Sequence, residues 1–121
     1  MIQFTCITDP RLTSLPPPAR FIVAAHLATL RSICKRPPHP GEDGFVGFVE
    51  AQDTPEVLES AIGRSLLQLE SVFREGDCLV GVVLWGNAGA GVTLVLPEIA
   101  GHAPQVAALL TETYLTNGEK R

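Results

Sequence analysis

The 121-residue sequence has one Trp, one Tyr, one Met and three Cys, and only 18% of its residues are charged. No apolar run reaches the 18 or more residues of a membrane span, and the first ten residues lack the basic and apolar regions of a signal peptide. We therefore expect a cytoplasmic protein with no membrane partner. The length and the 45% apolar content are typical of one domain, residues 1–121, that needs no disulfide or metal to fold.

Cysteine and motif patterns also exclude several kinds of site. Cys6, Cys34 and Cys78 are far apart and odd in number, which favours buried free thiols over a disulfide or a metal site. The sequence has no His-x-Glu, Cys-x-x-Cys, nucleophile elbow or paired carboxylate. Residues 86–93, GNAGAGVT, resemble a P-loop, but Val92 replaces the Lys that would reach the phosphates. We expect no cofactor and no bound metal.

The net charge of −4 is unevenly distributed. Residues 1–36 contain five Lys or Arg and one acid, whereas residues 37–121 contain four Lys or Arg and twelve acids. The acidic balance argues against nucleic-acid binding, for which Arg20, Arg31, Lys35 and Arg36 are the candidate residues. The two halves complement each other within the fold, or the acidic part faces a basic partner.

A β-hairpin at about residues 78–97 is the predicted centre of the fold. Two runs rich in Val and Leu flank the glycine-rich segment 86–91, and glycine accepts the backbone angles of a reversing chain. With the period of two that separates the faces of a strand, both faces of the hairpin are apolar. These strands are therefore expected at the centre of a sheet, covered on both faces by helices or on one face by a partner chain.

The remaining elements predict an α+β fold with a mainly antiparallel sheet. Periodicity and proline positions predict strands at 2–7 and 45–50, a long helix at about 18–35, a short helix from about 55 and a C-terminal helix at about 104–116. Residues 64–74 are ambiguous. A short helix followed by a strand, which gives a three-stranded meander, is favoured over a continuous helix from Pro55 to Arg74, which Gly63 interrupts.

Three histidines and one group of acids are the candidate catalytic residues. His26 lies toward the apolar side of the long helix, while His39 and His102 lie in loops. Asp53, Glu56 and Glu59 surround a helix start, where the helix dipole already explains acidic side chains. A small enzyme that uses His26, His39 or His102 with a cysteine or carboxylate is the alternative function.

A resemblance covers roughly residues 43–100. The order Asp43-Gly44-Phe45-Val46, Glu50, Asp53, short helix, Gly63, then Gly89-Ala90-Gly91 and Val95-Leu96-Pro97 resembles small uncharacterised proteins carried on bacterial mobile elements. The resemblance implies a bacterial cytosolic accessory protein and brings no activity with it.

The favoured function is protein–protein interaction, as a binding or inhibitory module without catalysis of its own. The predicted contact residues are Leu79, Val83, Trp85 and Val95, with Trp85 as the anchor, if that face of the sheet is uncovered. The partner is another protein or a second copy of the chain, and a homodimer is the simplest case.

Overall fold

The computed structural model describes residues 1–39, 42–84 and 91–119, and for 117–119 it describes the backbone alone. The predicted α+β fold is confirmed. The helices are α1 (Pro17–Cys34), α2 (Pro55–Ile62) and α3 (Pro104–Glu119), with short 3-10 helices η1 (Pro10–Ser14) and η2 (Leu66–Gln68). The strands are β1 (Ile2–Phe4), β2 (Gly44–Phe48), β3 (Ser71–Glu75), β4 (Cys78–Leu84) and β5 (Gly91–Pro97).

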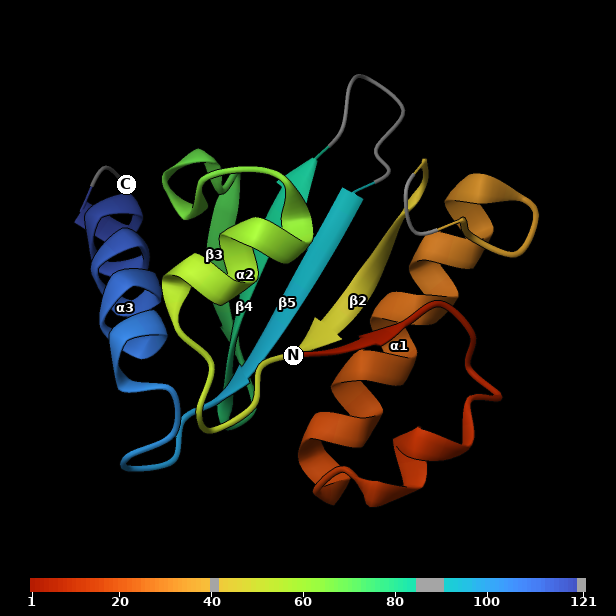
Figure 1. The fold of residues 1–121 in the computed structure, drawn as a ribbon, viewed down its shortest axis with the longest axis horizontal. Helices are drawn as coiled ribbons and strands as arrows, with labels where there is room; N and C mark the ends of the chain where they lie inside the picture. Colours follow the sequence, from red (N-terminus) through yellow and green to blue (C-terminus); the bar gives the residue numbers. More distant parts are fainter. Residues whose placement is uncertain (40–41, 85–90, 120–121) are drawn as a thin grey trace.

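The strands form one sheet in the order β1-β2-β5-β4-β3 (Figure 1). The β2–β5 pair is parallel and the other pairs are antiparallel, so the mainly antiparallel prediction is confirmed. The hairpin strands β4 and β5 lie inside the sheet, as predicted, and β3 completes the meander. The predicted turn lies outside the described residues, except for Gly91, which begins β5. The predicted strand 2–7 is shorter than expected and ends at Phe4.

Helix α1 begins and ends where backbone geometry requires. Pro17 and Pro18 occupy its first two positions, where the missing N–H groups have no partner in the helix anyway. The helix ends at Cys34, and the next residue, Lys35, has a left-handed backbone (φ 59°) and donates its N–H to the carbonyl of Arg31. In the described ranges, no helix is both long and apolar enough to cross a membrane.

The ambiguous segment after α2 is a strand, so a continuous helix to Arg74 is wrong. Thr54 caps the start of α2, because its hydroxyl accepts the N–H of Val57 at 3.4 Å. Gly63 ends the helix with φ 79°, and its N–H donates to the carbonyl of Glu59. This left-handed conformation favours glycine. The chain then turns through η2 into β3.

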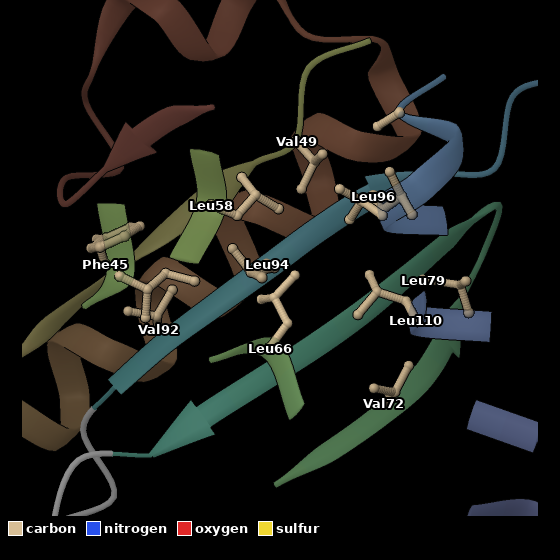
Figure 2. Close-up of a cluster of buried hydrophobic side chains, with 13 residues drawn as sticks. Phe45, Val49, Leu58, Leu66, Val72, Leu79, Val92, Leu94, Leu96 and Leu110 are labelled. Atoms are coloured by element: carbon tan, nitrogen blue, oxygen red, sulfur yellow. The ribbon is translucent and has the colours of Figure 1, made fainter. Parts of the chain in front are cut away.

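Helices cover both faces of the sheet (Figure 1). One face packs against α1 and η1, and we call this side the α1 layer. The other face packs against α2, η2 and α3, the α2–α3 layer, whose core is the larger one (Figure 2). Its labelled side chains are Phe45, Val49, Leu58, Leu66, Val72, Leu79, Val92, Leu94, Leu96 and Leu110.

An ion pair ties the first residue to the loop after β2. The ammonium group of Met1 lies 2.8 Å from Asp53 Oδ2 and 3.1 Å from Glu50 Oε1. Burial lowers the pKa of this ammonium, but hydrogen bonds to the two carboxylates raise it by more, so the pKa lies above its ordinary value. Asp53 also accepts the N–H of Glu50 at 2.8 Å, which fixes the loop.

Candidate protein interaction surface

Three of the four hairpin residues predicted as an interface are buried in the structure, and the fourth is not described. Leu79 and Val83 are each 1% exposed beneath the α2–α3 layer. Val95 is fully buried on the opposite face, in the α1 layer, and Trp85 lies outside the described residues. The four residues therefore do not share one uncovered face, and an interface built on them stays a prediction that requires helices to move.

The histidines lie in three separate places. His102 donates from Nε2 to the carbonyl of Val49 at 2.7 Å, which is a structural bond. His39 has an exposed side chain in the turn before β2. His26 Nε2 lies 2.8 Å from Glu75 Oε1, and the His26 ring lies 6.1 Å from that of Phe73. Of the three, His26 has a carboxylate partner, and it is the catalytic candidate that the geometry retains.

The candidate acids around α2 have structural partners or an exposed position. Asp53 holds the Met1 ammonium and the Glu50 N–H. Glu59 Oε2 accepts the N–H of Leu66 at 2.7 Å, and Glu56 is exposed in the first turn. In the described part of the chain, no group of three or more His, Cys, Asp or Glu is placed to hold a metal ion.

The three cysteines differ in solvent exposure, although the sequence predicted that all three are buried. Cys78 is 2% exposed in the α1 layer, and burial raises the pKa of its thiol to about 11. Cys34 is half-buried, and the expectation of a buried Cys6 is wrong, because the chain leaves the sheet after Phe4 and exposes it. Cys6 Sγ lies 2.9 Å from Thr8 Oγ1, and this hydrogen bond lowers the pKa of the thiol.

A small hollow of about 170 Å³ opens between α1 and the sheet. It is lined by the apolar Ile33 of α1 and Leu84 of β4, and by His26 of α1. The half-buried Val82 and Thr93 form its floor on paired positions of β4 and β5. A cavity of this order holds one aromatic ring and is smaller than the sites that enclose cofactors.

A larger hollow, of about 780 Å³ and open to solvent, runs along the outer side of α3. Ile99 on the loop before α3 and Leu115 on α3 both line it, and each is 57% exposed. On the other flank of the helix, a second hollow of about 250 Å³ is lined by Leu67, which is 83% exposed, and by Leu109. We call this outer side of α3 with its two hollows the α3 surface.

The charge of the α3 surface comes from two carboxylates, Glu98 on the loop before α3 and Glu112 on the helix. Between Pro104 and Thr116 the exposed positions include one ionisable side chain, Glu112. Glu112 lines both hollows and takes part in none of the ion pairs formed by the described residues. The nearby Arg74 is bound by Glu98 at 2.7 and 3.1 Å and lies over the Tyr114 ring.

Sequence reasoning identified the buried side of α3 and missed its outer side. Val106 and Leu110 are fully buried, as the predicted apolar face requires. The exposed side contains Ala108 and Leu115 together with the polar Gln105, Glu112 and Thr116, so it has one charged residue where a solvated helix usually has several. This lack of charge is visible in the sequence and is the signal that finds the surface.

Comparisons with protein-family models, with curated proteins and with solved structures give no match to this chain. The interpretation of the α3 surface therefore depends on its own geometry and charge.

Proposed function

We propose that this chain is a small bacterial accessory protein of the cytoplasm that acts by binding another protein, or a second copy of itself, and not by catalysis. The proposed binding site is the α3 surface, in place of the hairpin, where Leu79, Val83 and Val95 are buried. The class of function is the one that the sequence favours, but the binding site is now formed by apolar side chains that are exposed to solvent.

One observation carries the proposal: beyond its buried side, α3 exposes Leu115 next to Ile99 of the preceding loop, and both side chains line the same hollow. The inner residues of α3, Val106 and Leu110, fill the core, while Leu115 and its neighbour Ile99 remain 57% exposed. Clusters of exposed apolar side chains next to hollows are typical of protein interaction sites, whereas single exposed ones, such as Val57, are ordinary.

Site-specific photo-crosslinking in the producing cells tests this function. A benzoylphenylalanine at Leu115 is expected to form a covalent adduct with a partner, and one at Val57, which is similarly exposed at 50%, is not. A supporting adduct also disappears when Ala108→Asp is introduced into the same chain, because the added carboxylate would be desolvated in the contact. Absence of an adduct at Leu115, or the same adducts from both positions, would contradict the proposal.

A small enzyme built on His26 is the second candidate function, favoured by the His26–Glu75 pair beside the 170 Å³ hollow. A carboxylate that orients a histidine in this way is a recurring arrangement for general bases. Its test is a panel of activated ester and phosphoester substrates with the wild type and His26→Ala. Turnover that is lost in the variant would support the enzyme, and equal rates with both proteins would dispose of it.

A further inference from the structure

The shape and charge of the α3 surface identify the kind of partner it fits. We infer that it binds an amphipathic helix of a different protein, whose apolar side packs along α3 and whose Lys or Arg meets Glu112. This inference rests on the proposed function and adds the structure and charge of the segment that is bound.

The shape of the larger hollow argues for a helical partner. The α3 residues that line it include Pro104, Ala108, Thr111 and Leu115, at spacings of four, three and four. This is a straight stripe along the helix, and from Pro104 to Thr116 it extends for about 18 Å at 1.5 Å per residue. Small side chains along the stripe allow a second helix to approach closely, with Ile99 as the opposite wall.

Charge argues for a basic partner. Glu112 lines both hollows among uncharged Ala, Leu and Thr side chains of α3 that a docked helix would cover. A carboxylate that loses water without a partner is destabilising, and one that gains a Lys or Arg becomes part of a charge-assisted hydrogen bond. Arg74 is already held by both oxygens of Glu98. The cation is therefore expected from the partner.

The same charge argues against a second copy of this chain as the occupant. Two α3 surfaces face to face would bring together two Glu112 carboxylates. Among the described residues, the lining of the two hollows contains no Lys or Arg to compensate them. Like charges placed opposite each other oppose association.

Two 18-residue model peptides with the same leucine face test the inference. One has lysines on its polar face and the other has glutamates. Each is titrated into the isotope-labelled full chain and followed by NMR. We expect the lysine peptide to shift the resonances of residues 104–116 and to bind about tenfold more tightly than the glutamate peptide, the scale of one charge-assisted hydrogen bond.

A charge-reversal variant separates specific pairing from general attraction. Glu112→Lys should reverse the preference, so that the glutamate peptide binds more tightly. Glu56→Lys makes the same change in net charge at an exposed position on α2 and should leave the lysine peptide preferred. Reversal by both variants equally would overturn the inference, because attraction to net charge alone would then explain the binding.

Other outcomes separate this inference from the proposed function. If the two peptides bind equally, or neither binds while the adduct at Leu115 persists, the basic-helix inference fails and the interaction function stands. If the adduct at Leu115 is the chain itself and Leu115→Asp dissociates a dimer, the occupant is a second copy and the inference is likewise overturned. Loss of the Leu115 adduct in cells would instead count against the proposed function.

Discussion

The two long helices lie on opposite sides of the molecule and meet solvent differently (Figure 1). Helix α1 exposes the apolar Phe21 and Ile33 together with Arg31, and the cation Lys35 follows at its end. Helix α3 exposes Leu115 at the larger hollow, and Glu112 lines both hollows. Both helices bury a continuous apolar stripe against the sheet.

The difference shows that burying a core does not by itself determine what the outer side of a helix contains. The inner sides of α1 and α3 satisfy the same physical requirement, which is removal of apolar surface from water. Their outer sides are free to differ. The outer side of α1 combines Phe21 and Ile33 with a cation, whereas that of α3 combines Leu115 with an acid and lines two hollows.

The largest expected effect contrasts the inner and outer sides of α3. Leu110→Ala removes a fully buried side chain from the core and should lower the free energy of unfolding by about 2–5 kcal/mol. Leu115→Ala removes the same atoms from a 57% exposed position and should change it by less than about 0.5 kcal/mol. Urea denaturation of both variants measures the contrast. Equal losses would show that Leu115 belongs to the core of the single chain.

A second contrast concerns pH, because the α1 layer contains a buried ionisable group. The Cys78 thiol has a folded pKa of about 11 against an ordinary value of 9.0, so the neutral form is favoured by folding. The contribution of this thiol to the free energy of unfolding is therefore complete below pH 9. It is lost as the pH rises through 11, and the loss is roughly 2–3 kcal/mol at most.

Denaturation between pH 8 and 11 measures this loss. Cys78→Ala should flatten the decline, whereas Cys6→Ser, which changes an exposed thiol, should leave it in place. The Met1 ammonium also has a raised pKa, so its ion pair is complete below pH 8.0 and weakens above it. Part of the decline should therefore remain in Cys78→Ala. A flat wild-type curve would contradict both assignments.

The sequence predicts much of this fold because local signals and burial agree there. Prolines mark the starts of the three helices, Gly63 marks the end of α2, and the β-branched runs of 78–97 form the strands of the central hairpin. Residues 64–74 are harder, because the helical period continues through Phe73 while Gly63 ends the helix with φ 79°. At Gly63 the left-handed backbone conformation ends the helix, although the apolar side chains continue at helical spacing.

The site is less predictable, because exposure depends on packing between distant segments. The hairpin strands are apolar on both faces, and that pattern alone does not tell a face covered by the chain's own helices from one left open to a partner. His26 and Glu75 are 49 positions apart and meet through the fold alone. The outer side of α3 is different, since its lack of charge can be read from residues 104–116.

The most direct test of the central claim is the native mass of the untagged protein taken straight from lysate, compared with Leu115→Asp and Val57→Asp. We expect the wild type and Val57→Asp to have extra mass from a bound protein, and Leu115→Asp to have the mass of a single folded chain. A single-chain mass for the wild type, or equal loss of the partner in both variants, would contradict the claim that α3 forms the binding surface.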